Sequence, residues 1–219
     1  MDWTQFWPPI RLSIQVAIIS SIVATIIGVS IAWWMSKHSF KGKIVLETIF
    51  MLPLVLPPTV VGFLLLVILG RNSVIGQAIE WLFHSTFIFS WWGAVIAAVV
   101  VAFPLIYQSM KAGFAAIDQD LLAAGRSIGA NERQLFWYVT LPLTWRSLMT
   151  AYILGFARSL GEFGATLMVA GNIPGKTQTL PTAIYVAVDS GNITMAWAWS
   201  LTIILISCLM LLLTNRGVR

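Results

Sequence analysis

Five long apolar stretches constrain the fold of this chain more than any other feature of its sequence. They cover residues 10–35, 44–69, 91–110, 147–170 and 196–213. A helix needs about 20 mostly apolar residues to cross the hydrocarbon core of a bilayer, where backbone groups have no water to bond. Only 10% of the 219 residues are charged, whereas a typical soluble domain has about 25%. The sequence therefore predicts one all-α integral membrane domain over residues 1–219, with five transmembrane helices.

The lysines and arginines at the ends of these stretches and between them are divided unevenly between the two sides of the membrane. Nine fall on the side that receives the C-terminus, namely Lys37, Lys41, Lys43, Lys111, Arg126, Arg133, Arg146, Arg216 and Arg219. Three fall on the other side, namely Arg11, Arg71 and Lys176. Because loops rich in lysine and arginine face the cytoplasm, we expect the N-terminus outside the cell and the C-terminus in the cytoplasm.

The second stretch carries an unusual pair of prolines in its middle, in the string Leu56-Pro57-Pro58-Thr59. Two consecutive backbone donors are lost there, so the helix must kink or break. One interpretation is a kink that serves only helix packing. The other is a bend that lines a water-filled cavity or gate, where irregular backbone is tolerated. The second interpretation makes Pro57, Pro58 and Thr59 candidates for a translocation pathway.

The segment between the third and fourth stretches has strong local helix signals. Asp118 can cap a short helix, and Gly129 supplies a left-handed stop for it. Asn131 can cap a second short helix, with Gln134 three residues later as in a capping box. We therefore predict a cytoplasmic helix-turn-helix over residues 118–142.

The second of these short helices has an apolar and aromatic face. Leu135, Phe136, Tyr138 and Val139 contribute to it, and Pro142 is expected to end the helix or bend the chain into the fourth stretch. Such a helix can rest on the lipid surface. It can also dock in a groove of a soluble partner.

This segment resembles the cytoplasmic signature of the permeases of ATP-binding-cassette importers. The string Ala123-Ala124-Gly125 is followed, after three intervening residues, by Gly129, and after nine more residues by Val139-Thr140-Leu141-Pro142. The spacing fits the signature throughout. Two identities depart from it, because Ala123 stands where glutamate is common and Gly125 where alanine is common.

The resemblance implies that the segment is a coupling helix, which inserts into a cleft of a cytoplasmic ATPase. It implies that ATP and magnesium are bound by that ATPase and that this chain binds no cofactor and catalyses no reaction. In agreement, the sequence holds no Gly-x-x-x-x-Gly-Lys-Ser/Thr phosphate loop. The residues expected to couple to the ATPase are Ala124, Gly125, Gly129, Ala130, Asn131, Leu135, Phe136, Val139, Leu141 and Pro142.

The fourth stretch contains two ionisable residues, Arg158 and Glu162, which are costly inside a membrane and are candidates for function. Their spacing of four residues allows an ion pair on one helix face. One interpretation is that the pair neutralises itself and only fixes the packing between helices. The other is that Arg158 binds an anion, which requires that Glu162 does not already satisfy its charge. The candidates for the translocation pathway in this stretch are Arg158, Ser159, Gly161, Glu162, Gly164 and Thr166.

The same stretch resembles the permeases for molybdate, tungstate and sulfate, through the string from Ala157 to Thr166. The strings Leu52–Gly62 and Gly171–Pro181 look most like the molybdate branch. This resemblance implies a homodimer in the bacterial plasma (inner) membrane, with two ATPase subunits and an extracytoplasmic oxyanion-binding protein. Molybdate is the expected substrate, and tungstate or sulfate and thiosulfate are the alternatives. No nucleic-acid partner is expected.

Two other functional classes fit the sequence poorly. An intramembrane enzyme would need a nucleophile with a base, or a metal site, yet His38 and His84 lie in different loops and no stretch contains histidine. An ion-coupled secondary transporter would show inverted repeats, and we see none. The outer segments 71–90 and 171–194 are either docking surfaces for the binding protein or solvated connectors.

Overall fold

The computed structural model describes residues 3–217 and the side chains of residues 4–212, and all regular elements in that part of the chain are helices. Arg219 and the side chain of Arg216, both counted above, lie outside the described residues. The helices are α1 (Trp3–Lys37), α2 (Lys43–Val55), α3 (Pro58–Leu69), α4 (Val74–Phe83), α5 (Trp91–Ala115), α6 (Gln119–Ser127), α7 (Glu132–Leu135), the π-helical turn η1 (Phe136–Thr140), α8 (Leu141–Leu143), α9 (Trp145–Leu160), α10 (Gly164–Ala170), α11 (Leu180–Asp189) and α12 (Ile193–Gly217).

Three helices, α1, α5 and α12, are long and apolar enough to cross a membrane as single rods. They match the first, third and fifth predicted stretches. The second and fourth stretches each form two helices instead, with a bend of 116° between α2 and α3 and of 62° between α9 and α10. The described part of the chain therefore has between three and five candidate spans, depending on whether each bent pair counts as one.

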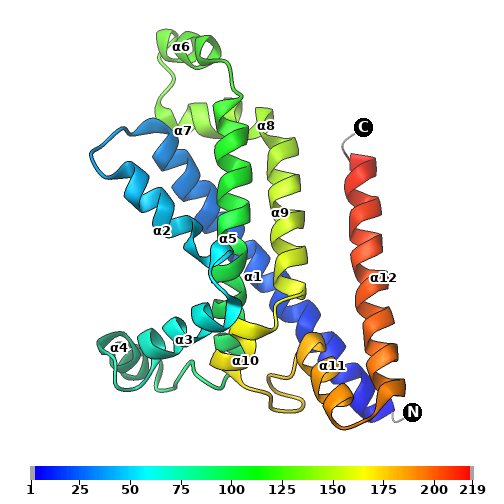
Figure 1. The fold of residues 1–219 in the computed structure, drawn as a ribbon. Coiled ribbons are helices and arrows are strands. Elements are labelled where there is room, and N and C mark those ends of the chain that lie inside the picture. The colour runs from blue at the N-terminus through cyan, green and yellow to red at the C-terminus, as the bar shows by residue number, and fades with distance from the viewer. Residues whose placement is uncertain (1–2, 218–219) are drawn as a thin grey trace.

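The centre of the molecule is a bundle in which α1, α5 and α9 pack against one another (Figure 1). Glycines allow these helices to approach closely. A Cβ added at Gly28 of α1 would lie 2.8 Å from Ile106 Cγ2, and one added at Gly155 of α9 would lie 2.4 Å from Ile106 Cδ1. Small residues of this kind are the usual means of close helix packing in membranes.

The outer segments 71–90 and 171–194 were expected to be either docking surfaces or solvated connectors. They contain the helices α4 and α11. Ser73 caps α4 by accepting a hydrogen bond from the Gly76 amide, at 2.8 Å. α11 packs on α12 through Leu180, Met195 and Trp199. Each of the two helices has only ten residues, which is too few to give a clear transmembrane signal.

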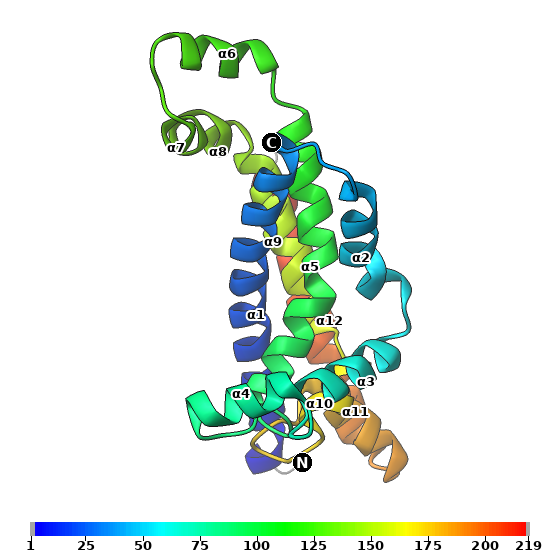
Figure 2. The same cartoon turned by 90° about the vertical axis from the view of Figure 1, so that its left-hand side faces the viewer.

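The two ends of the molecule are formed by different helices (Figures 1 and 2). One end holds α6, α7, α8 and the last turns of α12, and the opposite end holds the start of α1 together with α3, α4, α10 and α11. Among the described side chains, those at the first end include Lys37, Lys41, Lys43, Lys111, Arg126, Arg133 and Arg146, whereas Arg11, Arg71 and Lys176 lie toward the other. The basic residues are therefore gathered at the end that carries α6–α8.

Candidate functional site

The break in the second stretch falls at its proline pair. Leu56 and Pro57 have extended backbone, with ψ of 145° and 137°, and Pro58 opens α3 at its first position. A proline disfavours the helical conformation of the residue before it, and two prolines in a row remove two donors. Pro57, Pro58 and Thr59 are exposed. The predicted interruption is confirmed, and it is a sharp turn rather than a kink within one rod.

The fourth stretch is broken as well, and its prediction as one helix over residues 147–170 is wrong. Gly161 ends α9, and Glu162 and Phe163 lie between α9 and α10. The Glu162 carboxylate accepts a hydrogen bond from the Ala165 amide at 2.8 Å. Because this side chain satisfies an amide that a continuous helix would bond through its backbone, it favours a new helix start over continuation.

The two breaks lie against each other, where α3 crosses α10. A Cβ added at Gly164 would lie 2.9 Å from Pro58 Cβ, and one added at Gly62 would lie 2.7 Å from Met168 Cβ and 2.9 Å from Ala165 Cα. Only glycine permits this distance without a shift of the neighbours. The structure thus brings together the candidate pathway residues of the second and fourth stretches, which are about a hundred residues apart in sequence.

Arg158 and Glu162 form the predicted ion pair, with 2.6 Å between Arg158 Nη1 and Glu162 Oε2. The pair was expected to lie on one continuous helix face. Instead, it joins Arg158 in the last turn of α9 to Glu162 in the break between α9 and α10. The Glu162 side chain is 1% exposed and that of Arg158 is 28% exposed. Ser159 and Thr166 are both buried. Of the candidate pathway residues Arg158, Ser159, Glu162 and Thr166, only Arg158 has a partly exposed side chain.

At the other end of the molecule, the local helix signals are confirmed. The Asp118 carboxylate accepts from the Asp120 amide at 2.9 Å. Gly129 has a φ of 88°, in the left-handed region. Asn131 and Gln134 form a reciprocal capping box at the start of α7. We call the unit from Gln119 to Leu143 the α6–α8 segment.

The expectation that Pro142 ends the second short helix or bends the chain is wrong in detail. The helix continues through the turn η1 to Leu143, and the chain changes direction at Thr144. In η1, the Leu141 amide bonds to the Phe136 carbonyl, five residues back. A π-helical turn is wider than an α-helical one, so it accommodates a proline ring that would clash with the carbonyl four residues before it.

Within the α6–α8 segment, the two short helices touch through Leu135, which is 2% exposed. A Cβ added at Gly125 of α6 would lie 2.5 Å from Leu135 Cδ2. Outside this contact lies an open depression of about 370 Å³, lined by Gly125, Ile128, Gly129, Ala130, Gln134, Leu135, Tyr138 and Val139. Ile128, Trp137 and Tyr138 are largely exposed beside it. Several of the predicted coupling residues therefore lie around one apolar surface, which we call the α6–α8 surface.

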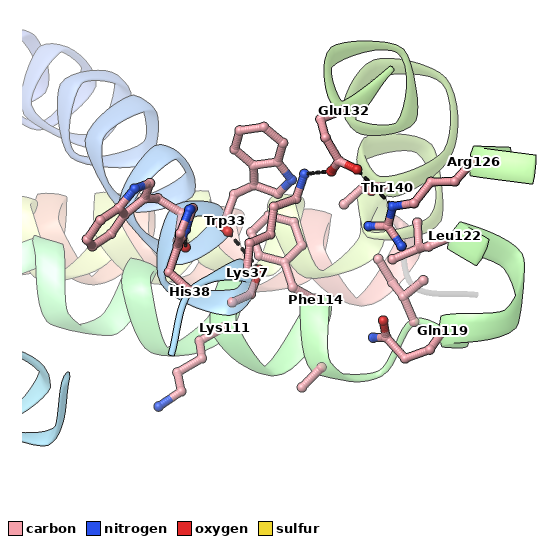
Figure 3. A pocket seen from close by; sticks show the side chains of 14 residues that line it. Trp33, Lys37, His38, Lys111, Phe114, Gln119, Leu122, Arg126, Glu132 and Thr140 are labelled. Atoms are coloured by element: carbon pink, nitrogen blue, oxygen red, sulfur yellow. Dashed lines mark hydrogen bonds and ion pairs between the residues drawn. The ribbon is translucent and has the colours of Figure 1, made fainter. Parts of the chain in front are cut away.

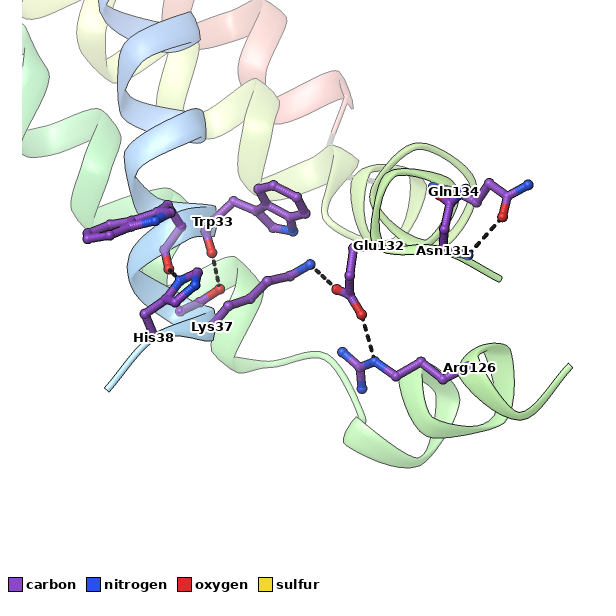
Figure 4. A network of polar contacts seen from close by, with 9 residues as sticks. Trp33, Lys37, His38, Arg126, Asn131, Glu132 and Gln134 are labelled. Atoms are coloured by element: carbon purple, nitrogen blue, oxygen red, sulfur yellow. Dashed lines mark hydrogen bonds and ion pairs between the residues drawn. The ribbon is translucent and has the colours of Figure 1, made fainter. Parts of the chain in front are cut away.

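An ion-pair network that was not predicted from the sequence lies at the base of this segment (Figure 4). Glu132 accepts from Arg126 Nε at 2.8 Å and pairs with Lys37 at the end of α1. Its bonds to Arg126 and then to Lys37 lower the pKa of the Glu132 carboxyl to about 2. Lys37 and Glu132 are 95 residues apart, and no local pattern in the sequence links them.

Residues 24–217 match the family described as "Binding-protein-dependent transport system inner membrane component". The chain belongs to this family of transport permeases. It is therefore a multi-pass, non-catalytic component of the inner membrane in a binding-protein-dependent ATP-binding-cassette system. It binds no cofactor itself, and the family implies an ATPase and a periplasmic binding protein as partners.

Two relatives match the permease over most of its length. It is 61% identical over 208 residues to the putative molybdenum transport system permease protein YvgM of Bacillus subtilis, which is 95% of this chain and 92% of that protein. It is 42% identical over 184 residues to the molybdenum transport system permease protein ModB of Escherichia coli K12, which is 84% of this chain and 80% of that protein.

The solved structure of the MetNI methionine ABC transporter in an inward-facing conformation has the same fold as the permease. The TM-score is 0.73 at 15% sequence identity, over 100% of this chain and 98% of that chain. At this identity the likeness shows the fold alone. It confirms the predicted all-α fold of an importer permease.

Proposed function

We propose that this permease translocates molybdate into the cell, driven by ATP hydrolysis in a separate subunit. The observation that carries the proposal is the near full-length similarity to a permease named for molybdenum transport. Tungstate and sulfate are the alternatives, because all three are tetrahedral dianionic oxyanions.

We further propose that the end of the molecule with α6–α8 lies in the cytoplasm and that the start of α1 lies outside the cell. The support is the gathering of basic residues at the α6–α8 end, since lysine and arginine are enriched in cytoplasmic loops. In this orientation α4 and α11 face outward, where the binding protein would dock over segments 71–90 and 171–194.

The α6–α8 surface is the proposed docking site for the ATPase. It is apolar and exposed, with Ile128 at 87% and Tyr138 at 79% exposure. A short apolar helix in a groove is a common mode of recognition. The capping box of α7 and the stop at Gly129 keep the helix ends rigid, as a lever requires.

The crossing of α3 and α10 is the proposed gate, and a second copy of the chain is its opposite wall. Pro57, Pro58 and Thr59 are exposed there in the single chain. Irregular backbone is not tolerated against lipid, but only inside protein or along water. A homodimer that faces two such crossings toward each other would meet this demand and would put Thr59 and Arg158 near a shared path.

The proposal is tested by uptake of labelled molybdate into proteoliposomes that contain the permease, its ATPase and its binding protein. We expect uptake of labelled molybdate to require both ATP and the binding protein. We also expect unlabelled tungstate to inhibit this uptake more strongly than sulfate does. Uptake of sulfate in preference to molybdate would reassign the substrate. Uptake of molybdate at full rate without the ATPase would overturn the mechanism.

A further inference from the structure

Three charged side chains from three separate elements meet at the base of the α6–α8 segment. Lys37 comes from the last turn of α1, Arg126 from α6 and Glu132 from the first position of α7. The two carboxylate oxygens of Glu132 are divided between them, one to each cation, as Figure 4 shows. Glu132 thereby joins the two short helices to each other and also to a helix of the central bundle.

An aromatic contact lies beside this ion pair and joins the same helices. The rings of Trp33 in α1 and Phe136 in η1 are 4.8 Å apart, centroid to centroid. The Lys37 ammonium lies over the Trp33 ring, 3.8 Å from its centroid. Lys37 is thus held by a cation–π contact on one side and by Glu132 on the other, so its position is well defined.

The remaining space between the segment and the bundle is open. A cavity of about 710 Å³ separates the α6–α8 segment from the ends of α1 and α5 (Figure 3). Phe114, Gln119 and Leu122 line it, together with the three charged residues. Side chains do not fill this space. The ion pair of Glu132 with Lys37 and the ring contact of Phe136 with Trp33 join the segment directly to α1, and Leu122 of α6 packs against the core that α1 shares with α5.

We infer that Glu132 is a positioning residue that fastens the α6–α8 segment to α1, so that movement imposed on the segment is passed to the bundle through α1. Without it, the segment stays attached through its chain connections to α5 and α9. The link through α1 matters because α1 packs along both α5 and α9. This inference rests on the proposed docking of the ATPase at the α6–α8 surface.

The test uses the complete complex with ATPase and binding protein, reconstituted in proteoliposomes. The quantity measured is the number of molybdate ions imported per ATP hydrolysed. For Glu132→Gln we expect this ratio to fall about fivefold, the lower end of typical coupling between sites. A loss of folded complex would lower transport and hydrolysis together and leave the ratio unchanged. Lys41→Gln, which neutralises an exposed lysine between α1 and α2, is the matched control and should keep the wild-type ratio.

A double-mutant cycle separates the link to α1 from other effects of the substitution. Lys37→Gln should lower the ratio as well, and the double variant Lys37→Gln with Glu132→Gln should be no worse than Glu132→Gln alone, because both remove the same contact. Wild-type ratios in both single variants, or losses that multiply in the double variant, would overturn the inference. If instead the wild-type complex itself imports no molybdate with ATP, the proposed function fails.

Discussion

The permease brings distant parts of the chain together at the crossing of α3 with α10 and at the base of the α6–α8 segment, and these two regions are held in opposite ways. At the crossing of α3 and α10, glycines bring backbone against backbone, with Gly62 and Gly164 at distances that admit no further atom. At the base of the α6–α8 segment, half-exposed charges meet above a cavity. The first junction is steric and buried, whereas the second is electrostatic and open to water.

This difference indicates what each junction can do. A glycine contact in a close-packed interior resists small changes, so α3 and α10 would move together at the proposed gate. An ion pair at the surface contributes little to stability but sets an orientation, and it can re-form after movement. We therefore expect substitutions at the crossing to act on folding and transport together. Substitutions at the base of the segment should act on coupling with little effect on folding.

The largest effect is expected for Arg158→Ala. It leaves the Glu162 carboxylate, 1% exposed, without its cation, and removal of one partner of a buried pair costs about 3–5 kcal/mol. We expect a lower midpoint of thermal unfolding in detergent, and lower molybdate uptake. The double variant Arg158→Met with Glu162→Gln should regain most of the midpoint, because glutamine can still accept from the Ala165 amide. If Arg158→Ala takes up molybdate at the wild-type rate, the pair has no role in transport and serves only helix packing.

Gly164→Ala should be the next most severe change. The added Cβ would meet Pro58 Cβ at 2.9 Å and the Thr59 amide nitrogen at 3.3 Å, and overpacking of this kind costs about 1–3 kcal/mol. Gly161→Ala is the matched control, since its nearest neighbour would be the Ala157 carbonyl oxygen at 3.6 Å. The difference between the two unfolding midpoints measures the steric junction. Equal midpoints would show that α3 and α10 can move apart at no cost.

Gly129→Ala should have a smaller and more local effect. Nothing lies within 4 Å of the added Cβ, so the cost comes from the left-handed backbone alone, about 1–2 kcal/mol. We expect less ATPase to co-purify with this variant, while the unfolding midpoint of the bundle stays near that of the wild type. Gly125→Ala would place its Cβ 2.5 Å from the Leu135 Cδ2 methyl, a side-chain end that can rotate while the backbone stays in place, and this variant should lose less ATPase. A stronger loss of ATPase in Gly125→Ala than in Gly129→Ala would contradict this ranking.

The same two regions mark how far the sequence could predict the structure. The α6–α8 segment was predictable because its signals are local: Asp118, Gly129 and Asn131 each act within four residues. The break at Pro57 was predictable for the same reason. The break at Glu162 was not predictable from hydropathy. An apolar stretch has the same hydropathy whether it forms one straight helix or two helices at an angle. The contact of Lys37 with Glu132 depends on the tertiary fold alone.

The smallest expected effect is the pH dependence of the junction at Glu132. Its carboxyl has a pKa of about 2 in the folded protein, against an ordinary value of 4.5, because Arg126 and Lys37 favour its charged form. A lowered pKa means that the pair contributes its full stabilisation above about pH 4.5 and loses it as the pH falls from there toward the folded-state value. The side chain is 48% exposed, so this contribution is small.

The measurement is the difference in unfolding midpoint between the wild type and Glu132→Gln. We expect a small difference that is constant from neutral pH down to about pH 5 and that shrinks at lower pH. A difference that already changes between pH 7 and pH 5 would mean that the carboxyl is not held by its two cations. Raising the salt concentration at neutral pH should reduce the same difference, because exposed charges are screened. The steric junction at Gly164 gives the contrast, since the midpoint difference between Gly164→Ala and Gly161→Ala should not respond to salt.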